Sequence, residues 1–189
     1  MRISKSAPVA MMAALFLPAC AASPPKPMVR EDLVQRTATV ESIDQASRLV
    51  TIRTEDGYAT TIKVGDEVRN LPQVRAGDKV IVSYYQALAA ELKKPGEGVE
   101  GVQTDVGAVR ANPGQMPAGG VGMVMRTTVT IESVDTKANT VTFKRADGSP
   151  DSVVVQSPEG EAFIKGLKKG DRVEIAYTEA LAVEVKPVN

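Results

Sequence analysis

Short segments in which apolar and polar residues alternate dominate the chain. In TVTIESV, residues 128–134, and TVTF, residues 140–143, apolar and polar residues largely alternate and β-branched residues are frequent. In RVEIAY, residues 172–177, the alternation places Val173, Ile175 and Tyr177 on one side. A period of two residues is typical of half-buried β-strands. The pattern therefore predicts an all-β fold.

The same pattern occurs twice along the chain. VESIDQASRLVTIRTEDG, residues 40–57, returns as IESVDTKANTVTFKRADG, residues 131–148. A second match relates KVIVSYYQALAAEL, residues 79–92, to RVEIAYTEALAVEV, residues 172–185, and about a third of all aligned positions are identical. Such self-similarity indicates that one structural unit has been duplicated.

Five strands are expected in each copy. The expected ranges are 37–43, 49–54, 58–64, 79–85 and 87–92, and in the second copy 128–134, 140–144, 151–156, 172–177 and 180–185. Asp-Gly pairs at 56–57 and 147–148 predict tight hairpins, and Gly-Asp pairs at 77–78 and 170–171 predict a second turn. The segment PEGEAFIKGLKKG, residues 158–170, is predicted to be a short helical or irregular crossing between the third and fourth strands.

This layout is typical of a small OB-like Greek-key barrel, with an SH3-like barrel as the alternative. We therefore predict two tandem five-stranded barrels, at 36–92 and 126–186. Residues 93–125 are rich in Gly and Pro and predict a flexible linker or long loop between the barrels, with a hairpin in it as an alternative. Residues 20–35 contain several prolines and predict a tether.

The chain begins with the layout of a secretory signal. Two basic residues, an apolar run and small residues follow one another in MRISKSAPVAMMAALFLPACAAS. The apolar run is about half the length of a membrane-spanning helix. The sequence therefore predicts an exported protein that is not anchored by a spanning helix.

The end of this signal, LPAC, resembles the lipobox of bacterial lipoproteins on Leu17, Ala19 and Cys20, although Pro18 departs from it. The resemblance implies that residues 1–19 are removed and that Cys20 carries a lipid. The alanine that follows implies an outer-membrane anchor facing the periplasm. The alternative is ordinary cleavage that leaves a soluble periplasmic protein.

Composition narrows the chemistry. The chain has 23 basic and 23 acidic residues, which argues against nucleic-acid binding. It has no His and a single Cys, so imidazole catalysis and disulfides within the chain are excluded. Repeated acids such as Asp44 and Asp135 occur where turns are expected, which favours a scaffold role over a carboxylate hydrolase. We predict no enzymatic activity and no cofactor.

Methionines are the remaining candidates for metal ligands. Met116, Met123 and Met125 lie close together, and thioethers suit Cu(I). The repeat also resembles the small periplasmic copper-carrying barrels of metal-efflux systems in its VDxxxxxVT opening and its LKKGDRV turn. That family binds copper with a His, two Met and a Trp, and this chain has neither His nor Trp. We therefore predict no metal site and keep the three methionines as weak candidates.

Two groups of residues are candidates for a binding surface, one of tyrosines near the end of the fourth strand and one of basic residues in the second copy. They are Tyr84, Tyr85 and Tyr177, and Lys165, Lys168, Lys169 and Arg172. The tyrosines alternatively cap a barrel core. The basic residues either form a solvated turn or bind lipid phosphates or acidic glycans.

Over nearly its full length the chain resembles uncharacterised exported lipoproteins of proteobacteria that carry two copies of VxSVDxxxxxVTxxxxDG and LxxGDxVxVxYxEALAxEV. This resemblance implies the duplicated architecture and no particular activity. The sequence thus predicts a non-catalytic binding or structural module of the cell envelope. Its partners would be the membrane, through the lipid, and an envelope protein or glycan; a copper-binding protein is the alternative, and a hydrolase a remote one.

Overall fold

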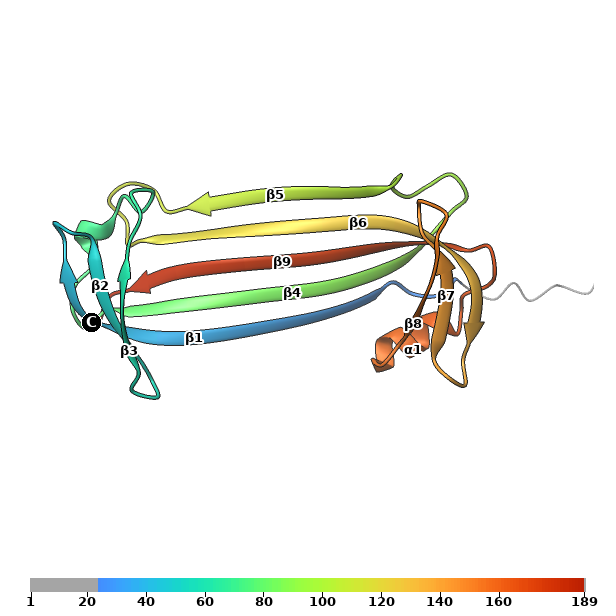
Figure 1. Ribbon diagram of the computed structural model, residues 1–189, viewed down its shortest axis with the longest axis horizontal. Coiled ribbons are helices and arrows are strands. Elements are labelled where there is room, and N and C mark those ends of the chain that lie inside the picture. The colour runs from blue at the N-terminus through green and yellow to red at the C-terminus, as the bar shows by residue number, and fades with distance from the viewer. Residues whose placement is uncertain (1–23, 189) are drawn as a thin grey trace, which may run out of the picture.

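The computed structural model describes residues 24–188, which form one antiparallel sheet of nine strands (Figure 1). The strands are β1 (Met28–Asp44), β2 (Leu49–Thr54), β3 (Ala59–Lys63), β4 (Lys79–Lys93), β5 (Val102–Arg110), β6 (Ala118–Asp135), β7 (Thr140–Lys144), β8 (Pro150–Val154) and β9 (Arg172–Lys186). A 3₁₀ turn, η1 (Leu71–Gln73), precedes β4, and the helix α1 (Pro158–Ile164) precedes β9. The predicted all-β class is confirmed, and the predicted short crossing contains α1.

The predicted arrangement of two separate barrels is not what the structure shows. The strand order is β3-β2-β1-β4-β9-β6-β7-β8, with β5 beside β6, and the sheet is open. The physical reason is the pairing of β4 with β9 along their whole lengths, from Lys79 opposite Lys186 to Lys93 opposite Arg172. The free backbone groups along the long strand of each copy therefore pair with the other copy, and neither copy closes into a barrel.

The two copies are related by a pseudo-twofold axis through the middle of the sheet. Gln86 of β4 pairs directly with Glu179 of β9, and these residues occupy the same position in the two repeats. The β1–β4 and β6–β9 registers correspond, and both copies have a bulge, at Val40/Ser42 and at Ile131/Ser133. The two repeats thus pair with one another as two identical subunits do in an isologous dimer.

Three predicted boundaries differ from the structure. The fourth and fifth predicted strands of each copy are one continuous strand, β4 or β9, since the alternation passes through 86 and 179 without a break. The predicted linker at 93–125 contains β5 and the start of β6. The predicted tether contains the start of β1 at Met28. In both cases a neighbouring strand supplies backbone partners that overcome a weak local preference.

A small module closes each end of the long strands (Figure 1). The first end module comprises β2, β3, η1 and residues 38–44 of β1, and the second comprises β7, β8, α1 and residues 130–135 of β6. The core of the first contains Val40, Val50, Leu71 and Val74. The core of the second centres on Val129, Ile131, Val141, Phe163, Ile164, Leu167 and Val173.

Both modules pack on the same face of the long strands. Val80 packs on the first core, whereas Ala90 and Leu92 pack in the second. Even numbers of positions separate these three residues, so their side chains lie on the same side of β4. We call this side the cleft face. Val185 of β9 also joins the first core, so each end module packs against strands of both repeats. Between the modules the sheet is a single layer.

The predicted turns are confirmed. Gly57 and Gly148 follow Asp in the two hairpins and have φ values of 88° and 83°, in the left-handed region that favours glycine. In the other turn the side chain of Asp78, only 5% exposed, accepts from Arg75 N at 2.8 Å and from Val188 N at 3.3 Å. This second contact fastens the C-terminal segment to the first end module.

The two outer edges of the long sheet differ. β5 pairs with β6 from Val102 opposite Thr127 to Arg110 opposite Gly119. The equivalent edge of β1, residues 28–37, pairs with no strand among residues 24–188. It carries several charged side chains, namely Arg30, Glu31, Asp32 and Arg36. Charged residues on an edge strand oppose pairing with other chains.

Candidate functional site

Two predicted binding residues, Tyr84 and Tyr177, meet at the pseudo-twofold axis on the cleft face. The Tyr84 hydroxyl donates to the Glu179 carboxylate, and Gln86 Nε2 donates to the Tyr177 hydroxyl at 2.7 Å. The hydrogen bond to Glu179, followed by desolvation, raises the pKa of Tyr84 to about 12. The hydroxyls thus bind side chains of the other repeat, and neither tyrosine caps a closed barrel.

Tyr85 lies on the opposite face, because neighbouring residues of a strand point to opposite sides. It is half-buried, and desolvation together with Glu31 raises its pKa. The structure therefore separates Tyr85 from Tyr84 and Tyr177, and the three do not form one binding surface.

The predicted basic cluster lies in the second end module. Lys165, Lys168 and Lys169 are exposed in the segment between α1 and β9, and Arg172 begins β9. Lys168 N donates to Asp171 Oδ2 at 2.7 Å, as expected of a turn. This geometry matches the solvated turn expected as one alternative from the sequence. The three lysines line neither of the two clefts described below.

The repeated acids have local structural partners. Asp44 Oδ1 accepts from Ala46 N at 2.9 Å and Ser47 N at 3.2 Å. Asp135 Oδ1 accepts in the same way from Lys137 N at 2.9 Å and Ala138 N at 3.0 Å. The Ser47 side chain together with the N–H groups of Ser47 and Ala46 lowers the pKa of Asp44, and the N–H groups of Ala138 and Lys137 lower that of Asp135. These contacts agree with the turn role expected from the sequence.

The methionines fall into two places. Met123 and Met125 are alternate residues of β6 on the cleft face, opposite Glu179 and Tyr177 of β9. Met116 lies in the turn before β6. Residues 24–188 hold no group of three or more His, Cys, Asp or Glu that could bind a metal ion. Cys20 and the predicted signal peptide lie outside the described residues.

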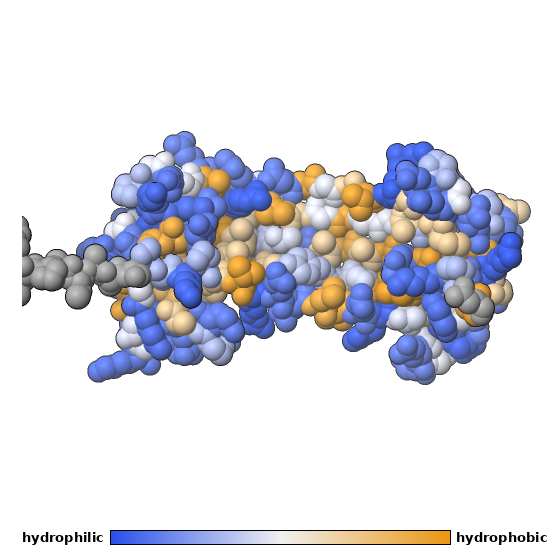
Figure 2. All heavy atoms as spheres, turned by 180° about the vertical axis from the view of Figure 1, so that it is seen from behind, coloured by the Kyte–Doolittle hydropathy of each residue, from blue (hydrophilic) through white to orange (hydrophobic). Residues whose placement is uncertain are grey.

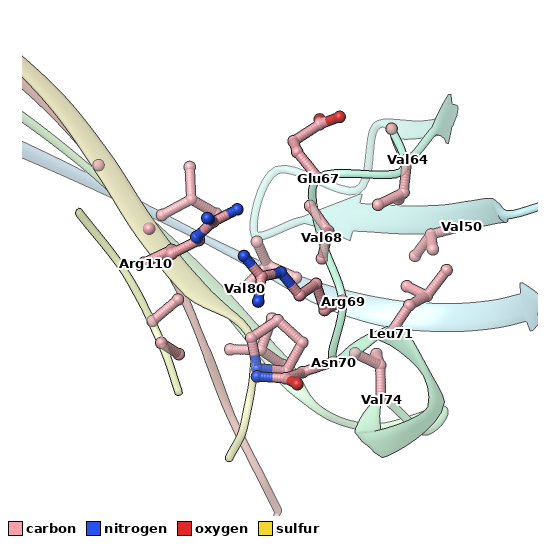
Figure 3. A pocket seen from close by; sticks show the side chains of 18 of the residues that line it. Val50, Val64, Glu67, Val68, Arg69, Asn70, Leu71, Val74, Val80 and Arg110 are labelled. Atoms are coloured by element: carbon pink, nitrogen blue, oxygen red, sulfur yellow. The ribbon is translucent and has the colours of Figure 1, made fainter. Parts of the chain in front are cut away.

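A large concavity lies where the first end module faces strands of the second repeat (Figure 3). This first cleft has a volume of about 720 Å³. Its walls are largely aliphatic, with Val50, Leu71 and Val74 from the end module and Val183 and Val185 from β9. A volume of this size is typical of small-molecule sites, which are concave and mostly apolar.

Polar contacts hold the loops around the first cleft in place. Arg48 donates from Nε to Val64 O and from Nη2 to Val68 O, both at 2.9 Å, and so orders the loop after β3. Buried Asn70 donates from Nδ2 to Asn112 O at 2.7 Å and accepts from Gly114 N at 3.2 Å. Asn70 therefore fastens the β5–β6 turn to the first end module.

Charged side chains gather around the first cleft. Lys63, Arg69 and Arg110 line it together with one acid, Glu67. In Figure 3 the side chains of Arg69 and Arg110 extend toward one another over the aliphatic wall, whereas the Glu67 carboxylate points away from them. Neither arginine has an acidic partner within ion-pair distance among residues 24–188.

A smaller counterpart lies at the pseudo-symmetric position, under the second end module. This second cleft has a volume of about 300 Å³. Leu88 lines it as the equivalent residue Leu181 lines the first cleft. Arg30, its only lining residue with a charge, pairs with Asp32 at 3.4 Å between Nε and Oδ2.

The sequence did not predict the first cleft. Its distinguishing residues, Arg69 and Arg110, lie in the loop before η1 and in the segment predicted as a linker, and neither segment is repeated. A usable signal was the alternation QTDVGAVR in residues 103–110, which is compatible with a strand. Nothing local indicated that this strand would lie beside the first end module.

Comparisons of the chain with protein-family models, with curated proteins and with solved structures gave no match. None of the helices among the described residues is long and apolar enough to cross a membrane. The cleft geometry is therefore the basis for a functional interpretation.

Proposed function

We propose that the chain is a non-catalytic lipoprotein of the cell envelope, facing the periplasm, that binds an apolar ligand in the first cleft. The observation that carries this proposal is the open cleft of about 720 Å³ with aliphatic walls. Burying apolar ligand surface there contributes about 25 cal/mol for each Å² removed from water. Ordered loops at its rim support a site that is formed before the ligand arrives.

The groups around the cleft support binding without catalysis. A general acid or base needs a side chain that exchanges protons near neutral pH, and the chain contains no His. The repeated carboxylates of Asp44 and Asp135 accept backbone hydrogen bonds in turns at the strand ends. The cleft supplies aliphatic contact and positive charge.

A lipid at Cys20 would orient the molecule. Pro25 lies against Gly166, so the chain enters at the second end module. β4 has 15 residues and, at about 3.3 Å per residue, is about 50 Å long, with the two modules over its opposite ends. An anchored protein would therefore hold the second module toward the membrane and present the first cleft to the periplasm.

Titration of the mature protein with the neutral fluorescent probe N-phenyl-1-naphthylamine tests the binding function. We expect saturable binding with one strong site. Leu181→Trp places an indole in the first cleft and should weaken this binding about tenfold or more. The control Leu88→Trp alters the equivalent residue, which is 41% exposed against 43% for Leu181, and should leave it unchanged. Absence of saturable binding would refute the proposal.

The lipid anchor has a separate test. Mass spectrometry of the protein isolated from membranes should give an N-terminal peptide that begins at Cys20 and carries acyl chains. Cys20→Ser should abolish this mass increase and release the protein from the membrane fraction. An unmodified Cys20 in membrane-derived protein contradicts the anchor without affecting the cleft.

Copper binding is a second candidate, favoured by the alternate placement of Met123 and Met125 on the cleft face. Two thioethers beside the Glu179 carboxylate offer a soft, incomplete ligand set for Cu(I). Metal analysis after incubation with Cu(I) tests it. Stoichiometric copper that is lost in the Met123→Leu, Met125→Leu double variant supports this function, and metal-free protein refutes it.

A further inference from the structure

The charge around the first cleft differs from that of an ordinary apolar groove. Three cations, Lys63, Arg69 and Arg110, line it, with Glu67 as the single lining acid. The side chains of Arg69 and Arg110 extend toward one another (Figure 3). Like charges that approach one another repel, and an anion between them removes this repulsion. The pair therefore forms a place for a negatively charged group.

The position between the two arginines, where an anion would bind, adjoins an aliphatic wall. Arg110 ends β5, and the cleft continues from it along Val121 of β6 and Val183 and Val185 of β9 into the first core. A ligand that satisfies both parts has an acidic group at one end and an extended apolar body. Charge-assisted hydrogen bonds from guanidinium groups suit carboxylates and phosphates equally.

We propose that the first cleft binds a single-chain anionic amphiphile, with its acidic head between Arg69 and Arg110 and its alkyl chain along the aliphatic wall. This inference rests on the proposed binding function and specifies the ligand class. Each additional methylene that enters the cleft should strengthen binding about fourfold, until the cleft is filled.

The second cleft provides a contrast within the same molecule. It is less than half as large, and its single lining cation, Arg30, already has Asp32 as a partner. Both Arg69 and Arg110 lie in segments that the duplication does not repeat. The anion preference therefore belongs to the first cleft alone.

Competition against N-phenyl-1-naphthylamine measures the preference on the unaltered mature protein. The competitors are dodecanoate, dodecyl phosphate and dodecanol, which share one alkyl chain, each below its micelle concentration. We expect dodecanoate and dodecyl phosphate to displace the probe at concentrations about tenfold lower than dodecanol. Equal potency of dodecanol and both anions overturns the inference, while probe binding itself still supports the proposed function.

Arginine variants then locate the head group. Arg69→Gln with Arg110→Gln should remove the advantage of the anions and leave the potency of dodecanol unchanged. Arg75→Gln is the matched control, since Arg75 is an exposed arginine of the same end that does not line the cleft. The anion advantage should persist in this control. Its persistence in the double variant overturns the assignment to Arg69 and Arg110.

The source of the amphiphile is a further outcome. Sedimentation with vesicles of anionic phospholipid tests whether a membrane surface could supply the charge instead. We expect the Cys20→Ser protein to remain in solution, because the head group of a free molecule fits the cleft more closely than a bilayer surface does. Vesicle binding that depends on Arg69 and Arg110, without preference among the soluble competitors, overturns the inference.

Discussion

The two ends of the molecule carry the two copies of the repeated sequence and differ in the side chains that fill their cores. In the second end module Phe163 and Ile164 of α1 are buried in the core. In the first, the residues before and at the start of η1 are Asn70 and Leu71, so a polar residue stands where the second repeat has Phe163. The end packed by the aromatic ring keeps a cleft of about 300 Å³, whereas the other end has a cleft of about 720 Å³.

The two repeats share the parts that pair within the sheet and differ in the segments that cover its ends. Strands and turns are shared because they must pair in the same register at both ends. The segments before β4 and β9 differ in length and content, since they cover the ends of the sheet and do not pair within it. Loops on a rigid scaffold commonly carry binding functions for this reason.

Removal of the aromatic filler should produce the largest effect. Phe163→Ala leaves a cavity in the second core and should lower the free energy of unfolding by about 3–5 kcal/mol. Urea denaturation followed by circular dichroism measures this change. The control Tyr58→Ala removes a ring that is 66% exposed and should change stability by less than about 0.5 kcal/mol. Equal effects of the two would contradict the difference in packing.

Loss of Asn70 should have an intermediate effect. Asn70→Ala leaves the Asn112 carbonyl and the Gly114 N–H without their partner, at a cost of about 1–3 kcal/mol. Hydrogen exchange at Gly114 should accelerate, while exchange in α1 at the other end stays unchanged. If both ends accelerated equally, the two modules would be coupled more tightly than the comparison implies.

The centre of the sheet should respond to alkaline pH. Because the Glu179 carboxylate raises the pKa of Tyr84 to about 12, folded Tyr84 keeps its proton where the unfolded side chain, with a value near 10.0, has lost it. Its stabilising contribution is present below pH 10 and is lost as the pH rises toward 12. NMR titration of the Tyr84 ring measures the midpoint, and Glu179→Gln should lower it. An unchanged midpoint would exclude Glu179 as the cause.

The smallest effects should be equal at the two ends. The Ser47 side chain and the N–H groups of Ser47 and Ala46 lower the pKa of Asp44, and the N–H groups of Ala138 and Lys137 lower that of Asp135. A lowered pKa stabilises the fold above the unfolded value of 3.8, and this contribution is lost as the pH falls through the folded value. Asp44→Asn and Asp135→Asn should each slightly reduce the loss of stability in acid, measured by urea midpoints from pH 5 to pH 2. A large difference between them would show that the turns have diverged.

Particular elements show how far sequence reasoning reached. The hairpins at Gly57 and Gly148 and the turns at Asp78 and Asp171 were predicted correctly, because Asp, Gly and strand alternation act locally. The crossing at 158–170, predicted to be helical or irregular, contains the helix α1. β5 was predicted as part of a linker, since its glycine and the glycines around it lower strand preference. Its pairing with β6 is a long-range contact that no local pattern reveals.

Of the predicted surface residues, Tyr84 and Tyr177 lie together, and Tyr85 and the lysines lie elsewhere. The arginines of the first cleft were not among the candidates. Arg69 and Arg110 are 41 positions apart, and only the return of β5 along the sheet brings them to one cleft. Their positions in the sequence do not indicate that they line the same cleft.

The sequence by itself determined most of the strands and the turns, because a period of two residues and Asp-Gly pairs are local patterns. It also showed the repeat, because self-similarity can be read directly from the sequence. Tertiary structure decided between two closed barrels and one shared sheet. The backbone groups along β4 can pair with a strand of their own copy or with β9, and both choices bury the same alternate side chains. The pairing of β4 with β9 settles that choice, and with it the clefts that form where one repeat covers the other.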